Sequence, residues 1–169
     1  MKGTGAEPEM TVQLCPGHKK KMNVAVIGGY KCSKKIYKIA EELGSLVAQQ
    51  NWVVICGGGS GVMEAVSRGA KREGGITVGI LPSFKGEEAN PYLDVEIPTG
   101  LGYARNFLIV RAADCLVAVD GKYGTLSEIA FALNEGKRVY GIDTWDIKGI
   151  IKVKNPQEVI RRIKKDFNL

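Results

Sequence analysis

The segment from Leu116 to Leu133 joins an apolar strand to a helix through a short turn that contains glycine. Residues 116–119 form an apolar run with the length and the β-branching of a strand buried in a parallel sheet. Apolar residues recur at helical spacing from Leu126 onward, and the turn between the two elements is Asp120, Gly121, Lys122, Tyr123, Gly124 and Thr125. A strand that enters a helix in this way leaves backbone N–H groups free at the helix N-terminus, where the helix dipole adds partial positive charge. The turn is therefore suited to hold a phosphate or another anion.

Strands and helices alternate along the rest of the chain. Apolar runs predict strands at Asn23–Ile27, Trp52–Cys56, Ile76–Leu81, Leu93–Ile97 and Arg138–Ile142, and Ile150, Ile151 and Val153 alternate near the end. Helical spacing follows the cap Ser33, begins again at Val62 and near Gly102, and returns over Gln157–Lys165 behind the cap Asn155. This alternation predicts an α/β fold with a mainly parallel sheet. We expect residues 1–21, which lack periodicity, to be a flexible leader, and residues 22–169 to form a single domain.

The net charge of +6 comes from the two ends of the chain. Residues 1–22 hold four Lys or Arg against two acids, residues 144–169 hold seven against three, and residues 23–143 balance at thirteen of each. The neutral body argues against a nucleic-acid partner. No apolar run approaches the roughly 20 residues of a membrane span, and the N-terminus lacks a signal-peptide core, so we expect a cytoplasmic protein with no membrane partner. The four cysteines and the single histidine lack zinc-ligand spacing, so we expect no metal site.

Three loops are expected to meet at one edge of the sheet. In a parallel sheet the turns from strand to helix lie at the carboxyl ends of the strands, which is the usual ligand side. Besides residues 120–125, these loops are residues 28–33, with Gly28 and Gly29, and residues 57–61, which are Gly57, Gly58, Gly59, Ser60 and Gly61. Glycine lets the backbone approach a ligand, although each of these glycines could also serve only to make a tight turn. The dinucleotide motif G-x-G-x-x-G and the P-loop motif G-x-x-x-x-G-K-[ST] are both absent.

Two charged residues near this edge allow two interpretations each. Glu128 follows Thr125 by three positions, so the pair reads as a capping box, in which the carboxylate only satisfies a backbone N–H group. Alternatively, that carboxylate faces the ligand and acts as a general base or holds a ribose hydroxyl. Arg105 lies in the first turn of the helix near Gly102, which is the end that the helix dipole disfavours for a cation. It is either a solvated cation or, as we prefer, the partner of an anion.

Three motifs resemble the Lonely Guy family, which was long mislabelled lysine decarboxylase and whose hallmark is P-G-G-x-G-T-x-x-E. They are GGGSGVME at 57–64, YARN at 103–106 and GKYGTLSE at 121–128. The resemblance covers residues 23–143. It implies a Rossmann-like three-layer α/β sandwich, a homo-oligomer (a dimer or a tetramer) and phosphoribohydrolase activity on cytokinin nucleoside 5′-monophosphates. It also implies that Arg105 and Glu128 form the catalytic pair and that Gly121, Gly124 and Thr125 bind phosphate.

The chain departs from the family pattern at four positions. Asp120 and Lys122 replace the proline and the second glycine of the hallmark, Asn106 replaces a lysine, and Ser127 stands where a glutamate is common. These departures resemble a sister branch that includes the molybdenum-cofactor carrier proteins, which bind a phosphorylated pterin without converting it. The predicted ligand-binding residues are Gly28, Gly29, Gly57, Gly58, Gly59, Ser60, Gly61, Met63, Arg105, Asn106, Gly121, Lys122, Tyr123, Gly124 and Thr125.

We therefore interpret the chain as a binder of a phosphorylated nucleotide-like or pterin ligand, with the molybdenum cofactor or a nucleoside monophosphate as the ligand and no further cofactor required. The alternative is a phosphoribohydrolase that cleaves the N-glycosidic bond of a nucleoside 5′-monophosphate. In the enzyme, Glu128 would stabilise the developing oxocarbenium ion or activate water, and Arg105 would anchor the substrate. The presence of Arg105 and Glu128 favours the enzyme, whereas Lys122 and Asn106 favour the binder. Nothing marks a Schiff-base lysine, which argues against a lysine decarboxylase.

Overall fold

A computed structural model of the chain describes residues 21–169. The expected leader therefore lies outside the described residues, apart from Lys21. The described part contains one sheet of seven strands, and every pair of neighbouring strands is parallel, in agreement with the predicted α/β class. The strands are β1 (Asn23–Gly28), β2 (Val53–Cys56), β3 (Ile76–Leu81), β4 (Val95–Pro98), β5 (Cys115–Val119), β6 (Val139–Ile142) and β7 (Ile150–Lys152).

The strand order is β4-β3-β2-β1-β5-β6-β7, so the chain builds one half of the sheet outward from β1 and then returns to build the other half from β5. The direction of winding reverses between these two central strands, where Val24 to Gly28 pair in register with Cys115 to Val119. Loops that leave two strands at such a reversal diverge to opposite faces and leave a crevice between them. The fold thus provides a ligand site beside β1 and β5.

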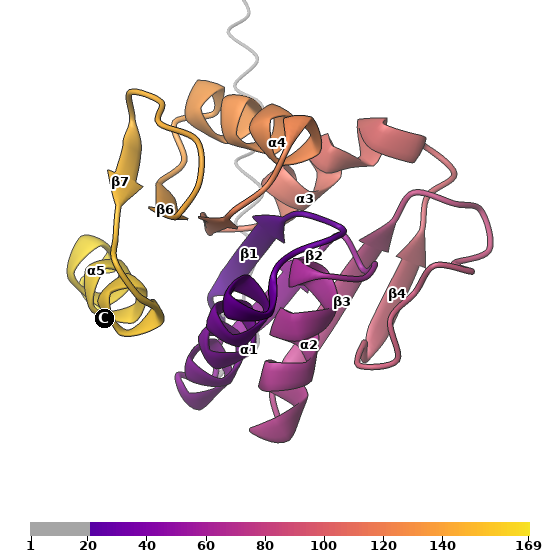
Figure 1. Cartoon of the computed structure of the whole chain (residues 1–169), viewed down its shortest axis with the longest axis horizontal. Helices are drawn as coiled ribbons and strands as arrows, with labels where there is room; N and C mark the ends of the chain where they lie inside the picture. Colours follow the sequence, from indigo (N-terminus) through magenta and orange to yellow (C-terminus); the bar gives the residue numbers. More distant parts are fainter. Residues whose placement is uncertain (1–20) are drawn as a thin grey trace, which may run out of the picture.

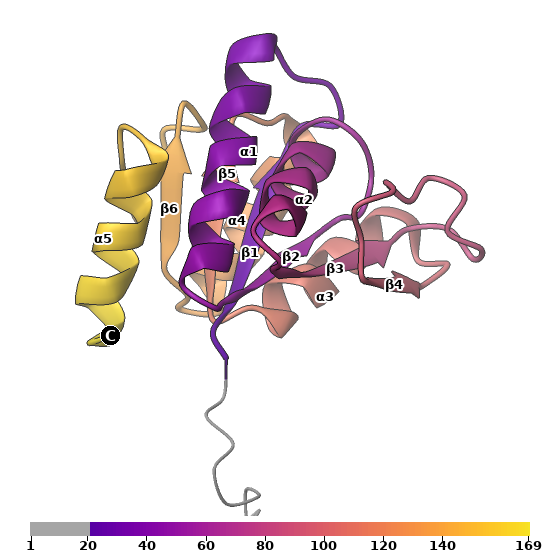
Figure 2. The same ribbon diagram turned by 90° about the horizontal axis from the view of Figure 1, so that it is seen from below.

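Helices cover both faces of the sheet, which makes three layers (Figure 1). On one face lie α1 (Lys34–Gln49), α2 (Val62–Arg72) and α5 (Pro156–Phe167), and on the other lie α3 (Asn106–Ala112) and α4 (Tyr123–Asn134). Each face has its own buried apolar cluster, because alternate residues of every central strand point to opposite faces. Figure 2 shows α5 at the edge of the first layer, beside the half of the sheet that ends in β7.

The caps of α1 and α5 follow the predictions from the sequence. The Ser33 hydroxyl accepts a hydrogen bond from the Ile36 N–H at 3.2 Å, and the Asn155 side chain accepts one from the Glu158 N–H at 2.9 Å. Pro156 occupies the first position of α5, where its missing N–H costs nothing. Both helices are amphipathic and bury their apolar stripe against the sheet.

Strands β2 and β6 each begin one residue later than predicted, and β4 begins two residues later. β4 starts at Val95, not at Leu93. The reason is that the side chain of Asp94, and not a backbone carbonyl, accepts the hydrogen bond of the Thr77 N–H group. Its carboxylate accepts hydrogen bonds from both the N–H (2.9 Å) and the hydroxyl (3.0 Å) of Thr77. Leu93 instead packs over Gly79. A Cβ atom added to Gly79 would lie 2.5 Å from the side chain of Leu93.

Candidate functional site

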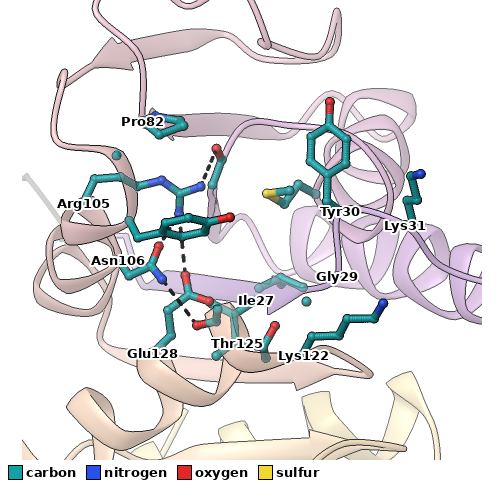
Figure 3. Close-up of a pocket in the computed structure, with 17 residues that line it drawn as sticks. Ile27, Gly29, Tyr30, Lys31, Pro82, Arg105, Asn106, Lys122, Thr125 and Glu128 are labelled. Carbon is teal, nitrogen blue, oxygen red and sulfur yellow. Dashed lines mark hydrogen bonds and ion pairs between the residues drawn. The ribbon is translucent and has the colours of Figure 1, made fainter.

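A pocket of about 640 Å³ opens at the carboxyl ends of β1, β2, β3 and β5, at the reversal in the strand order (Figure 3). A pocket of this size suits a small molecule or a cofactor. The lining combines glycine backbone, aromatic rings, three basic side chains and one carboxyl group. Its members are Val26, Ile27, Gly28, Gly29, Tyr30, Lys31, Gly57, Met63, Pro82, Gly102, Tyr103, Arg105, Asn106, Lys122, Gly124, Thr125 and Glu128.

The three predicted loops do meet, but not all of their residues line the pocket. Among the predicted ligand-binding residues, Gly28, Gly29, Gly57, Met63, Arg105, Asn106, Lys122, Gly124 and Thr125 line it, as does Glu128. Gly58, Gly59, Ser60, Gly61, Gly121 and Tyr123 do not. Several of these glycines instead let neighbouring loops pack closely, which is the alternative that the sequence left open.

Gly61 shows how the first two loops fit together. It has a φ of +67° and precedes the first residue of α2, whose N–H donates to the Gly29 carbonyl at 3.1 Å. A Cβ atom on Gly61 would lie 2.5 Å from the carbonyl oxygens of both Gly29 and Tyr30. From the other side, the buried Asn90 side chain donates to the carbonyls of Gly58 and Gly59 at 3.0 and 3.1 Å. Residues 57–61 are therefore held rigidly beside the pocket.

Arg105 is a largely buried cation in the pocket wall, its side chain only 12% exposed. It ends a short 3₁₀ helix (Gly102–Arg105) and leads directly into α3. Its guanidinium donates to the Asn106 Oδ1 atom at 2.9 Å and to the Gly57 carbonyl at 3.3 Å, whereas its buried Nε has no hydrogen-bond partner among the described residues. A Cβ atom on Gly57 would lie 2.5 Å from this guanidinium, so a larger residue there would displace the Arg105 side chain. Burial lowers the pKa of Arg105, but a guanidinium remains charged.

Glu128 lies across from Arg105, at 3.8 Å between Oε1 and Nη1. This separation makes an ion pair but is too long for a direct hydrogen bond. Glu128 is only 5% exposed, and burial raises its pKa to about 8, although Arg105 pulls the pKa in the opposite direction. Burial therefore favours the neutral acid form of Glu128, which is able to donate a hydrogen bond, whereas the nearby Arg105 favours the carboxylate.

The capping-box interpretation of Glu128 is wrong. Helix α4 begins at Tyr123 with Lys122 as its N-cap, and no side chain caps it. Thr125 is thus the third residue of the helix, and Glu128 lies in the second turn on the side that faces Arg105. The first N–H groups of a helix have no acceptor within it, so the N-terminus of α4 presents donors beside Gly124 and Thr125 in the pocket wall.

Asn106 connects Arg105 to α4 and is only 3% exposed. While its Oδ1 accepts from Arg105, its Nδ2 donates to the Ser127 hydroxyl at 3.0 Å and to the Gly124 carbonyl at 3.3 Å. Two of the departures from the Lonely Guy pattern, Asn106 and Ser127, are therefore direct neighbours in the fold. Together they form a neutral link in place of the lysine and glutamate common in that family.

Sequence reasoning missed seven further lining residues, which are Val26, Ile27, Tyr30, Lys31, Pro82, Gly102 and Tyr103. The signal for Tyr30 and Lys31 was present, because they directly follow Gly28 and Gly29 on a predicted ligand loop. Pro82 carried a similar signal, since it directly follows the predicted strand Ile76–Leu81. Within residues 21–169, no three or more His, Cys, Asp or Glu side chains gather as metal ligands would, and no helix is long and apolar enough to cross a membrane.

Comparison with known proteins shows relatives of two kinds. A protein of Archaeoglobus fulgidus is 44% identical over 142 residues, covering 83% of this chain and 93% of its own length. The cytokinin riboside 5′-monophosphate phosphoribohydrolase of Mycobacterium tuberculosis is 29% identical over 120 residues, which cover 66% of this chain and 64% of that protein.

Two solved structures share the whole fold. The molybdenum cofactor binding protein of Rippkaea orientalis has a TM-score of 0.84 and 34% identity, and it covers 89% of this chain and 99% of its own. The molybdenum cofactor carrier protein of Chlamydomonas reinhardtii has a TM-score of 0.80 and 30% identity, with 88% and 100% covered. Fold and relatives together define an α/β Rossmann-like protein of the Lonely Guy and molybdenum-cofactor-carrier type. Residues 21–167 match the SLOG cluster4 family, and the chain belongs to that family.

Proposed function

We propose that the pocket binds a small phosphorylated ligand with a flat heteroaromatic ring, either a pterin of the molybdenum-cofactor type or a nucleotide-like molecule. One observation carries this proposal: the N-terminus of α4 opens into a pocket whose lining holds Lys31, Arg105 and Lys122 against the single carboxyl group of Glu128. Backbone N–H donors, a helix dipole and an excess of cations all favour an anion.

The residues of the pocket fit both ligand classes. Thr125 and Gly124 offer the start of α4 to a phosphate. Tyr30 and Tyr103, which are 56% and 87% exposed, place two aromatic rings on the lining, where a pterin or a purine could stack. The likeness to the two molybdenum-cofactor-binding structures supports the pterin class.

The state of Glu128 supports binding without conversion. Stabilising an oxocarbenium ion requires a carboxylate, whereas burial raises the pKa of Glu128 and so favours its neutral form. The link through Asn106 is also neutral and brings no second catalytic charge to the pair. We therefore place the protein among ligand binders that hold the molecule intact.

Hydrolysis of the N-glycosidic bond of a nucleoside 5′-monophosphate is the second candidate function. It is favoured by the meeting of Arg105 and Glu128 across 3.8 Å at the pocket wall and by the likeness to the mycobacterial phosphoribohydrolase. A buried carboxylic acid with a raised pKa could protonate the departing base. This function requires that Glu128→Gln abolishes turnover while leaving binding intact.

Titration calorimetry with adenosine 5′-monophosphate and with adenosine tests the phosphate requirement. We expect the monophosphate to bind at least about tenfold more tightly than the nucleoside, because only it engages the donors of α4. Thr125→Ala should weaken binding of the monophosphate by about fivefold, the value of one hydrogen bond. The control Arg111→Gln removes a cation that pairs with Glu135 and does not line the pocket, and it should change nothing.

A second arm covers the pterin class. The protein would be purified without oxygen from a molybdate-supplied host, and its molybdenum and pterin content measured beside the same control variant. Loading in this arm, or phosphate-dependent binding in the calorimetry, supports the proposal. Equal affinity for adenosine and its monophosphate, together with no pterin in the purified protein, would overturn it.

A further inference from the structure

The three cations of the pocket lie at two separate ends. Arg105 stands at one end with Asn106 and Glu128, while Lys31 and Lys122 project at the other, as Figure 3 shows. They come from different elements: Arg105 precedes α3, Lys31 follows β1, and Lys122 is the N-cap of α4. The pocket therefore has a buried positive end and an exposed positive end.

The two ends differ in what balances their charge. Arg105 faces Glu128, but its guanidinium hydrogen bonds go to neutral oxygens, and its Nε has no hydrogen-bond partner among the described residues. Lys31 and Lys122 are exposed and form no ion pair with another described residue, whereas Lys35 nearby on α1 pairs with Asp143. Asp120, on the same turn as Lys122, does not line the pocket. Within the described lining, neither end has a carboxyl group in direct hydrogen-bonding contact with a cation.

We propose that the pocket takes a ligand with two separate anionic groups, one held at Arg105 and the other between Lys31 and Lys122 at the start of α4. This inference rests on the proposed function and narrows its ligand. A nucleoside 5′-monophosphate carries one anionic group and fills one end. A ligand with a second anionic group at a distance from the first can fill both ends.

Three probes separate the placement of charge from its amount. Adenosine 5′-monophosphate has one anionic group, adenosine 3′,5′-bisphosphate has two that lie apart on the ribose, and adenosine 5′-diphosphate has two that lie together. We expect the bisphosphate to bind about tenfold more tightly than the monophosphate, because a second charge-assisted contact forms. The diphosphate should gain less than about threefold, since its second phosphate adds charge without reaching the other end.

Variants at each end show which groups carry the gain. Lys31→Gln/Lys122→Gln removes the exposed end, and Arg105→Gln removes the buried one. Each should weaken the bisphosphate by about tenfold, whereas the monophosphate should respond to only one of them. The matched control Lys38→Gln/Lys165→Gln removes two exposed lysines outside the pocket and should change both affinities equally and slightly. Should Arg105→Gln fail to fold, Arg105→Gln/Glu128→Gln removes the charged pair together and serves the same purpose.

The inference is overturned if the diphosphate gains as much as the bisphosphate, because charge alone would then explain the gain. It is also overturned if the affinity for the bisphosphate is unchanged by the variant at either end of the pocket. The same holds if the bisphosphate binds no more tightly than the monophosphate. Phosphate-dependent binding of the monophosphate would survive that result, so the proposed function would stand. Absence of binding by all three probes, with no pterin in the purified protein, would overturn both.

Discussion

Arg105 is held in the pocket wall by neutral acceptors. The Gly57 carbonyl and the Asn106 amide fix its guanidinium, while the carboxyl group of Glu128 stays 3.8 Å away. A bidentate hydrogen-bonded pair between Arg105 and Glu128 would occupy the guanidinium N–H donors that an anionic ligand needs. The neutral link through Asn106 thus keeps a buried cation available to the pocket.

The pH dependence of stability tests the state of Glu128. Burial raises the pKa of Glu128 to about 8, whereas a glutamate in an unfolded chain titrates near about 4.3. Between these pH values the folded protein keeps a proton that the unfolded chain loses, so the free energy of unfolding falls as the pH rises. We expect Glu128→Gln to equal the wild type at low pH and to gain on it by up to about 1.4 kcal/mol per pH unit between the two pKa values. Urea denaturation at several pH values measures this, and a constant difference between the two proteins would contradict it.

The contact between Asn106 and Ser127 is tested by a double-mutant cycle. Asn106→Ala leaves Arg105 without one acceptor and should cost about 1–3 kcal/mol of unfolding free energy. Ser127→Ala removes the hydroxyl that accepts from Asn106 and donates to the Gly124 carbonyl, and it should cost about 1–2 kcal/mol. Because the two side chains touch at 3.0 Å, the double variant should lose less than the sum of the two. Strict additivity in chemical denaturation would show that the contact carries no energy.

Much of the site is predictable at the scale of single residues, and part is not. Arg105 and Glu128 stood out in the sequence because a cation at a helix start and an acid after a glycine turn both require explanation. The role of Asn106 was hidden, since its partner Ser127 is far along the chain and only the fold brings them together. The pattern of Thr125 and Glu128 also fitted a capping box, and only the actual start of α4 decides between the two interpretations.

At the scale of elements, the glycine loops act by packing as much as by facing the pocket. Gly61→Ala would place a Cβ atom 2.5 Å from two carbonyl oxygens, so α2 and the loop after β1 would separate. We expect a loss of about 3 kcal/mol or more in unfolding free energy. The control is Gly74→Ala, which has a similar φ of +69° but no atom within 4 Å of the added Cβ. It should lose only about 1 kcal/mol from backbone strain, and equal losses at both sites would refute the packing role.

A side-chain hydrogen bond joins helix α5 to β6. Tyr140 on β6 is fully buried, and its hydroxyl donates to the Asp166 carboxylate at 2.9 Å. Tyr140→Phe should cost about 1–2 kcal/mol, because the carboxylate loses a donor in a partly buried position. Tyr103→Phe, at a side chain that is 87% exposed, should stay within about 0.5 kcal/mol. Thermal unfolding of both variants measures the difference. An unchanged stability of Tyr140→Phe would show that packing alone anchors α5.

The bounds of the elements were predictable where a local signal marks them. Ser33 and Asn155 cap the helices that follow them, as their side-chain chemistry indicated. The start of β4 was not predictable, because the hydrogen bonds between Asp94 and Thr77 join residues that are separated in the sequence. Local chemistry therefore sets helix ends more visibly than it sets strand ends.

At the scale of the whole molecule, the strand order determines where chemistry can occur. The reversal between β1 and β5 gathers loops from both halves of the sheet at one crevice. The alternation of strands and helices in the sequence predicted that the loops would meet. The sequence did not predict which of the three cations would lie at the same end of the pocket, because they lie on separate loops. Residues 23–143 carry equal numbers of acidic and basic side chains, so the sequence did not reveal the local excess of positive charge in the pocket.

Release of free base from a panel of nucleoside 5′-monophosphates tests the central claim most directly. The protein would be incubated with each nucleotide near pH 7, and the products separated by chromatography. Wild type, Glu128→Gln and the control Arg111→Gln would be run side by side. Our account predicts that every nucleotide is recovered intact, with binding shown separately by calorimetry. Base release that appears with the wild type and the control, and vanishes with Glu128→Gln, would contradict the account and establish the hydrolase.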